Sequence, residues 1–419
     1  MSSGFRRLAL AVGLALSVVA CVSAPESPAT GGIASSEAAA PAPDAEARSD
    51  LRALIHLTRC ADRLAGIDDG IASCTWLLNN ARLEPEARAK VLVARATLLA
   101  AIGEFDAGLS DLDGAEVLDA RSEGLHMLRA QIRFDTGDYE VALPDTEVAI
   151  QQAPGQTRPL VLKAQLMALL RREDEALDAI DRAIALDGGL GEAHVLRAAI
   201  VLGKRKFAEA VVDFDRAEEL GVDASRIAAL RAVALLRLDE YERAITDLDL
   251  ALTEEPDNQN NWMLRGQAHA ELGLAKEAGR DFDRALALAP DSARILNGIA
   301  WAYATSPAPV RDAEAARRHA GEAIRIEPQN GYYLDTYAAS FVAAGDHAAA
   351  MSHYRRAMDI QPEVPGIYQK YLRERGLFDG ETDGQPSEAL IRAMEQHIRT
   401  GCALTDETCE GPDGVRIAG

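Results

Sequence analysis

The chain has 419 residues, of which 48% are hydrophobic but only 5% aromatic, and its formal net charge is −22. Alanine and leucine supply most of the apolar content, which suits many short amphipathic helices better than a β-rich core. Such an acidic chain argues against nucleic acid as a partner, because binding nucleic acid requires a basic surface. An anionic membrane surface would also repel it unless a covalent anchor holds it there.

The first residues predict a signal peptide over residues 1–20. Arg6 and Arg7 precede an apolar run from Leu8 to Ala20. This run is too short to cross a bilayer as a helix, but it has the length of a signal-peptide core. We therefore expect the chain to be exported.

The end of this run resembles a bacterial lipobox, with Val18-Val19-Ala20 before Cys21. The resemblance implies that Cys21 is lipidated and is the protein's only attachment to a membrane. Valine rather than aspartate at residue 22 implies a periplasmic lipoprotein anchored to the outer membrane. The remaining residues of 21–50 are rich in alanine, proline, serine and glycine without a helical or strand period, which predicts a flexible tether.

A period of 34 residues organises the rest of the chain. It is visible in the triplets that begin at Leu196, Leu230 and Leu264. When the units start at residues 89, 123, 157, 191, 225, 259, 293 and 331, the eighth residue of each is small: Ala96, Ala130, Ala164, Ala198, Ala232, Gly266, Ala300 and Ala338. Small residues at a fixed place allow two helices to approach closely.

The repeat resembles the tetratricopeptide repeat (TPR), whose signature is matched by Trp262, Gly266, Gly273, Ala278, Phe282, Ala285 and Pro290. The resemblance implies an all-α, right-handed superhelical solenoid of eight or nine helix pairs over residues 51–364. Two capping helices are expected in residues 365–419, over Tyr368 to Leu377 and over Pro386 to Thr400, with Ser387 as the N-cap of the second. The same reasoning predicts no strand and paired helices from about Leu51 to Gln361.

Two further columns of the repeat vary together. The seventh residue of six successive units is basic and the twenty-third is acidic in five of them. Where lysine replaces arginine, at Lys163, the aspartate becomes Ala179, and in the last two units Ile299 and Tyr337 coincide with His319 and His353. We therefore predict a ladder of arginine and aspartate side chains that joins helices within or between units. The alternative is that both columns are solvated and were inherited by duplication.

Four cysteines remain besides Cys21, an even number for an oxidising compartment. Their positions predict two local disulfides, Cys60–Cys74 and Cys402–Cys409. Buried thiols are the plain alternative. A zinc site is disfavoured because no paired Cys-x-x-Cys occurs. We expect no metal and no cofactor.

The first helix of each unit is predicted to expose one face on the concave side of the solenoid. Its second, fifth, ninth and twelfth places lie opposite the residues that pack inward. These places carry an apolar strip that we predict to be a groove for a protein or peptide client: Met127, Phe134, Val161, Val195, Leu202, Val233, Leu236, Met263, Gln267 and Trp301. Alternatively, tight coiling or the C-terminal segment covers these side chains.

The preferred function is a scaffold or adaptor of the cell envelope that binds other proteins. No nucleophile elbow, phosphate-binding loop or zinc-protease motif occurs in the sequence, so we expect no enzymatic activity. The alternatives are an accessory factor or weak enzyme of cell-wall metabolism, which would show ionisable residues clustered in the groove, and a structural spacer, which would show a polar inner face.

Overall fold

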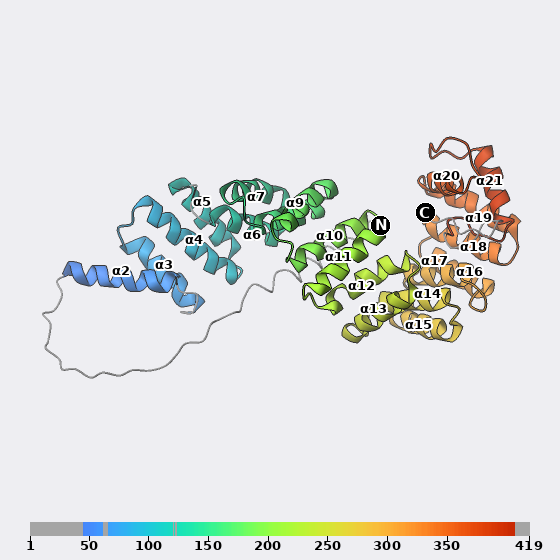
Figure 1. Cartoon of the computed structure of the whole chain (residues 1–419), viewed down its shortest axis with the longest axis horizontal. Coiled ribbons are helices and arrows are strands. Elements are labelled where there is room, and N and C mark those ends of the chain that lie inside the picture. The colour runs from blue at the N-terminus through green and yellow to red at the C-terminus, as the bar shows by residue number, and fades with distance from the viewer. Residues whose placement is uncertain (1–44, 62–65, 120, 122–123, 407–419) are drawn as a thin grey trace. The chain divides into compact units, whose positions relative to one another are not determined.

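The computed structural model describes residues 45–61, 66–119, 121 and 124–406 (Figure 1). In these ranges the chain forms twenty helices and no strand, as the sequence predicts. The chain divides into two compact units, residues 1–204 and 205–419, which are considered separately below.

The first unit contains four helix pairs and one further helix. Within each pair the two helices pack against each other, and each pair packs on the next. The elements are α2 (Ala45–Ala61), α3 (Ile67–Asn80), α4 (Pro85–Ala101), α5 (Phe105–Leu118), α6 (Leu125–Thr136), α7 (Tyr139–Gln152), α8 (Arg158–Leu169), α9 (Glu173–Leu186) and α10 (Gly191–Gly203). The tether predicted to end at residue 50 is shorter than expected, because α2 already begins at Ala45, in a stretch of good helix formers.

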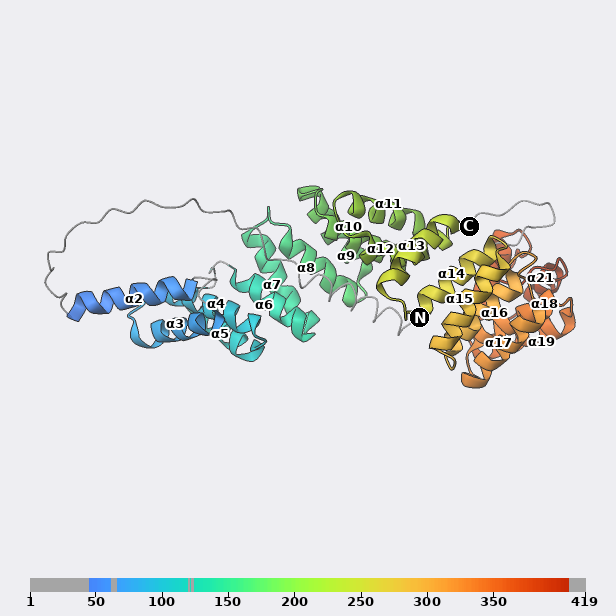
Figure 2. The ribbon, with the colours of Figure 1, turned by 90° about the horizontal axis from the view of Figure 1, so that it is seen from below.

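The second unit continues the same pattern and ends in two capping helices. Figures 1 and 2 show the hairpin-like pairs. The elements are α11 (Phe207–Glu219), α12 (Ala224–Leu236), α13 (Tyr241–Glu254), α14 (Gln259–Glu271), α15 (Ala275–Leu288), α16 (Ala293–Thr305), α17 (Ala313–Ile326), α18 (Gly331–Ala343), α19 (His347–Ile360), α20 (Val364–Glu374) and α21 (Glu388–Ile398). Ser387 caps α21 as predicted, because its hydroxyl accepts a hydrogen bond from the N–H of Leu390 at 3.1 Å.

The small residue at the eighth place is needed for close packing. Gly266 on α14 faces the ring of Phe282 on α15, and a Cβ added at Gly266 would lie 2.5 Å from Cε1 of that ring. Real side chains do not approach this closely, so a larger residue would force the two helices apart. The helix pairs of the two units are those of a tetratricopeptide solenoid.

The turn inside each pair repeats one backbone conformation. Gly103, Gly137 and Gly273 have φ angles of 79°, 87° and 72°, in the left-handed region that favours glycine. The equivalent turns, spaced by the same 34 residues, place Arg171 and Asp239 there with φ angles of 62° and 58°. The repeat therefore imposes the conformation even where the residue type opposes it.

Within the described part of the chain, none of the helices combines the length and the apolar character needed to cross a bilayer. The predicted signal peptide and Cys21 lie outside the described residues.

Candidate protein-binding surface

The predicted ladder is present. Four arginines each form two hydrogen bonds of 2.6–2.9 Å with the aspartate sixteen residues later: Arg95 with Asp111, Arg129 with Asp145, Arg231 with Asp247 and Arg265 with Asp281. Each of these contacts joins the first helix of a pair to the second, and the paired donors match the two carboxylate oxygens.

The same arginines also reach back to the preceding pair. Nη1 of Arg231 lies 2.9 Å from Asp215 and 2.5 Å from Glu218, both on α11. Arg231 is only 8% exposed, and its hydrogen bonds to Asp247 are the main reason that its pKa is raised above the ordinary value. Lys163, whose unit has no aspartate at the twenty-third place, contacts only Glu147 of the preceding pair. The ladder therefore joins helices both within and between units.

Aromatic contacts replace the ladder where its charges are lost. Tyr337 packs edge-on against His353 with a centroid separation of 4.8 Å, and His353 also stacks on Phe341. In the pair before, His319 stacks on Tyr303. Burial lowers the pKa of both histidines, which favours the neutral ring in these contacts.

The ten predicted groove residues divide into two groups. We define the inner face as the side of each first helix that is turned away from the second helix of its pair. Seven of the ten residues are half-buried: Met127, Phe134, Val161, Val233, Leu236, Gln267 and Trp301. The other three are buried: Val195, Leu202 and Met263. The expectation that these three side chains are open on the inner face is corrected by the structure.

Close packing of successive first helices covers Met263. Its sulfur lies against Gly298 of α16, where no side chain stands between the two helices. Beside it, Nε2 of Gln267 donates a hydrogen bond to the carbonyl oxygen of Gly298 at 3.1 Å. Much of the apolar strip therefore forms the seam between pairs, and the half-buried residues are what remains accessible.

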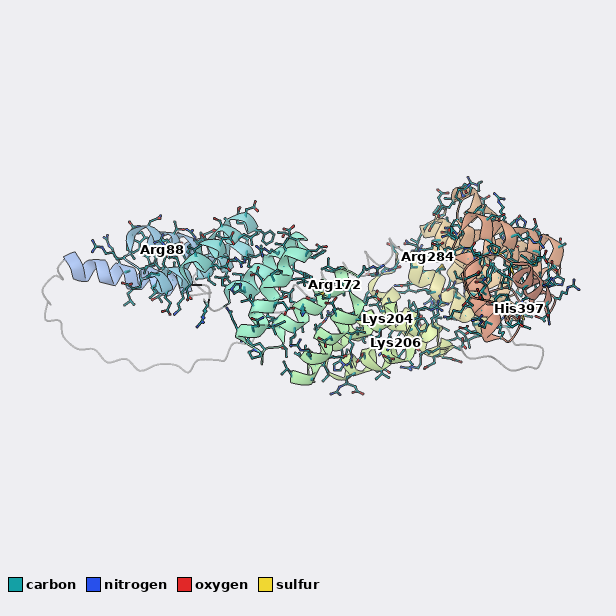
Figure 3. The ribbon with its side chains drawn as sticks, turned by 90° about the horizontal axis from the view of Figure 1, so that it is seen from above. Arg88, Arg172, Lys204, Lys206, Arg284 and His397 are labelled. Carbon is teal, nitrogen blue, oxygen red and sulfur yellow. A yellow bond between two sulfur atoms is a disulfide. The ribbon has the colours of Figure 1, made fainter. Side chains whose placement is uncertain are left out.

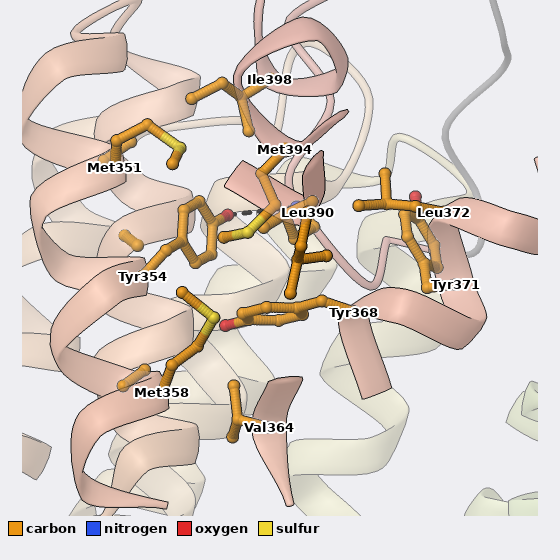
Figure 4. Packing of buried hydrophobic residues seen from close by; sticks show 14 of the residues in the cluster. Met351, Tyr354, Met358, Val364, Tyr368, Tyr371, Leu372, Leu390, Met394 and Ile398 are labelled. Carbon is orange, nitrogen blue, oxygen red and sulfur yellow. Dashed lines mark hydrogen bonds between the residues drawn. The ribbon is translucent and has the colours of Figure 1, made fainter. Parts of the chain in front are cut away.

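The C-terminal segment Cys402–Asp406 occupies part of the inner face of the last two pairs. Ala403 joins a buried cluster with Ala304 of α16 and Ala339 of α18, and Trp301 packs against this cluster. Leu404 is fully buried among helices α18 to α21. Figure 4 shows the aromatic rings and methionines that surround this region.

Four polar residues hold the segment, and we call Asp335, Tyr354, Tyr371 and His397 the cradle. The N–H of Leu404 donates to the hydroxyl of Tyr354 at 3.1 Å, the dashed bond in Figure 4. The hydroxyl of Tyr371 donates to the carbonyl oxygen of Asp406 at 2.9 Å. Nε2 of His397, which lies among the C-terminal helices in Figure 3, is 3.3 Å from the carbonyl oxygen of Ala403.

Asp335 is the fourth cradle residue. Its two carboxyl oxygens accept hydrogen bonds from the Tyr368 hydroxyl at 2.6 Å and from the Thr405 hydroxyl at 3.4 Å. Burial raises the pKa of Asp335 to about 7 and lowers that of His397 to about 4. Near neutral pH, therefore, Asp335 is partly protonated and His397 is neutral.

Sequence reasoning did not identify the cradle, although one signal was present. Asp335 stands at the fifth place of its unit, where the earlier units carry apolar residues: Val93, Met127, Val161, Val195, Ala229 and Met263. An acid in an apolar column indicates a special contact. Asn297 is the other polar exception, and its buried Oδ1 has no hydrogen-bond partner in the described structure.

The cysteines agree with the sequence in part. A disulfide joins Cys60 on α2 to Cys74 on α3, with a Cα–Cα distance of 4.9 Å. Cys402 is buried, whereas Cys409 and Cys21 lie outside the described residues, so the second disulfide and the lipid remain predictions. In the described ranges no three histidine, cysteine, aspartate or glutamate side chains are placed to hold a metal ion.

Two descriptions of repeat families match the sequence. The cytochrome c-type biogenesis protein H TPR domain matches residues 236–365, and the general tetratricopeptide repeat matches residues 195–261. Residues 195–365 therefore contain tetratricopeptide repeats, which generally mediate contacts between proteins. No curated protein matches the chain.

Several solved structures are similar to part of the chain. YrrB, described as a TPR protein with an unusual peptide-binding site, is 21% identical with a TM-score of 0.39, over 45% of this chain and 95% of that one. MamA from Desulfovibrio magneticus RS-1 is 18% identical with a TM-score of 0.38, over 41% and 94%. A tetratricopeptide repeat protein from Parabacteroides merdae ATCC 43184 is 15% identical with a TM-score of 0.43, over 60% and 98%. At these identities and TM-scores, the similarities carry no information about partners.

Proposed function

We propose that this protein is a non-catalytic scaffold of the bacterial cell envelope that binds a segment of another protein on its inner face. The observation that carries the proposal is the seating of Cys402–Asp406 on that face through hydrogen bonds to main-chain groups. Main-chain contacts do not depend on side-chain identity, so a surface that makes them can accept other protein segments. The half-buried apolar residues on the inner face of the earlier pairs extend the same surface.

The proposed location rests on the N-terminal sequence. A signal peptide followed by Cys21 would anchor the repeats to the outer membrane from the periplasmic side, and the acidic repeats would not adhere to the anionic surface themselves. A Cys21→Ser variant should move from the membrane fraction to the soluble periplasmic fraction. Retention of the variant in the membrane fraction would contradict lipid anchoring.

Binding on the inner face can be tested by site-specific photo-crosslinking in intact cells. A photoreactive amino acid replaces half-buried Leu236 on the inner side of α12. In a matched control it replaces Val212 on α11, which is 67% exposed. We expect a discrete protein adduct from position 236 and none from position 212.

A second variant guards against accidental adducts. Val233 lies one turn before Leu236 on α12, so Val233→Glu places a charge beside the crosslinker on the same face. This charge should abolish the adduct while the helical circular dichroism stays unchanged. Equal adducts from positions 212 and 236, or an adduct that survives the added charge, would place the partner elsewhere.

A further inference from the structure

The segment in the cradle is a tight turn with one strained residue. The N–H of Asp406 donates to the carbonyl oxygen of Ala403 at 3.4 Å, so Leu404 and Thr405 form the tip of the turn. Thr405 has a φ angle of 66°. A β-branched residue adopts this conformation only with strain, whereas glycine and asparagine adopt it readily. The chain's own turn therefore fits the cradle with a residue that is poorly suited to it.

The contacts of the turn depend on few of its side chains. Tyr354, Tyr371 and His397 all contact main-chain atoms of the segment. The side chain of Leu404 is fully buried in the apolar cluster between helices α18 and α21. A turn from another chain could make the same contacts if it carried leucine at the corresponding position.

The closed arrangement also buries a carboxyl group. Asp335 faces the turn from α18, and its hydrogen bond from Thr405 is long, at 3.4 Å. Burying a carboxyl group is costly, so an apolar residue here would hold the turn more firmly. The strain at Thr405 and the burial of Asp335 both weaken the closed state.

From these contacts we propose that the cradle is a binding site for a protein turn with leucine at its tip, and that Cys402–Asp406 is an internal competitor for this site. The best partner sequence has a small residue, leucine, glycine or asparagine, and then aspartate, because glycine or asparagine removes the strain that Thr405 carries. The proposal rests on the proposed function and names the chemistry of its partner.

The test uses a fluorescent peptide of residues 400–407 with Cys402→Ser, added to the full-length chain. In a Leu404→Glu variant the buried leucine becomes charged, which should expel the chain's own turn and free the cradle. We expect this variant to bind the peptide at least about tenfold more tightly than the wild type does. A peptide with Thr405→Gly should bind about fivefold more tightly again, and a peptide with Leu404→Asp should not bind.

The contribution of the cradle is tested in the Leu404→Glu chain. Adding Tyr371→Phe removes the hydroxyl that donates to Asp406 and should weaken peptide binding about fivefold. Tyr332→Phe on α18, where the side chain is 42% exposed, is the matched control and should leave binding unchanged. Equal binding to wild type and Leu404→Glu, or no binding while α21 stays folded, would overturn the proposal.

Hydrogen exchange of the wild-type chain decides the matter if Leu404→Glu unfolds the capping helices. We expect the amide of Leu404 to exchange at least about tenfold faster than that of Met394 inside α21, which shows opening of the turn alone. Equal protection would make the turn a permanent part of the core and overturn the proposal. Peptide binding without the crosslinked adduct at Leu236 would defeat only the proposed function, and the reverse result only the internal competitor.

Discussion

The two buried ionisable groups of the cradle predict opposite pH dependences that single substitutions should reveal. Asp335 has a pKa of about 7 against an ordinary value of 3.8, because it is buried. Between pH 4 and pH 7 the folded state therefore keeps a proton that the unfolded chain has released. The free energy of unfolding falls as pH rises through this window, by at most about 4 kcal/mol in total.

His397 has the opposite effect. Burial lowers its pKa from 6.5 to about 4, so between these values it is neutral in the folded state and protonated in the unfolded chain. Its contribution to the free energy of unfolding rises with pH across this window, by at most about 3 kcal/mol. Between about pH 4.5 and pH 6.5 the two contributions cancel in the wild type.

The perturbation is Asp335→Asn, which keeps an acceptor for Tyr368 and a donor for Thr405. The stability of this variant relative to wild type should be near zero at pH 4 and increase with pH, reaching a gain of roughly 2 to 4 kcal/mol above pH 7. His397→Gln should show the mirror image, with its gain growing as pH falls below 6.5. Asp359→Asn, at an exposed position on α19, is the control and should show no trend.

The assay is hydrogen exchange of the amides of α21 between pH 4.5 and pH 8, corrected for the intrinsic exchange rate. It follows the part of the molecule that the cradle stabilises. A stability difference for Asp335→Asn that does not change with pH would refute the reasoning, because it would mean that Asp335 ionises alike in both states.

Three further predictions concern the repeats. Arg231→Ala should lower the free energy of unfolding by about 3 to 5 kcal/mol, because it leaves buried carboxylates unpaired; Arg243→Ala, at a surface ion pair, should cost less than about 1 kcal/mol in the same urea titration. Gly266→Ala should cost about 1 to 3 kcal/mol through its clash with Phe282, whereas Gly279→Ala, whose Cβ would meet no atom within 4 Å, should stabilise α15 by up to about 1 kcal/mol in thermal unfolding. Arg171→Gly should raise stability by about 1 kcal/mol, since glycine removes the strain of a positive φ angle, and an unchanged midpoint would contradict this.

The sequence was sufficient for the features that recur in every unit. The period of 34 residues, the small residues at the eighth place and the covarying charges each appear several times, so one chain supplies its own comparisons. The contact between Arg231 and Asp247 was predictable because it joins neighbouring helices and follows a column. Such contacts are local, and each unit encodes them again.

The tertiary structure alone decided the features that occur once. Burial of Met263 depends on how closely α14 approaches α16 at Gly298, and the sequence pattern on one helix does not specify this distance. The cradle brings Thr405 to Asp335 across seventy residues, after a chain reversal beyond α21 that no repeat describes. A non-periodic contact over this separation is determined by the packing of all the intervening helices, and it therefore leaves only one unusual acid in an apolar column as its trace in the sequence.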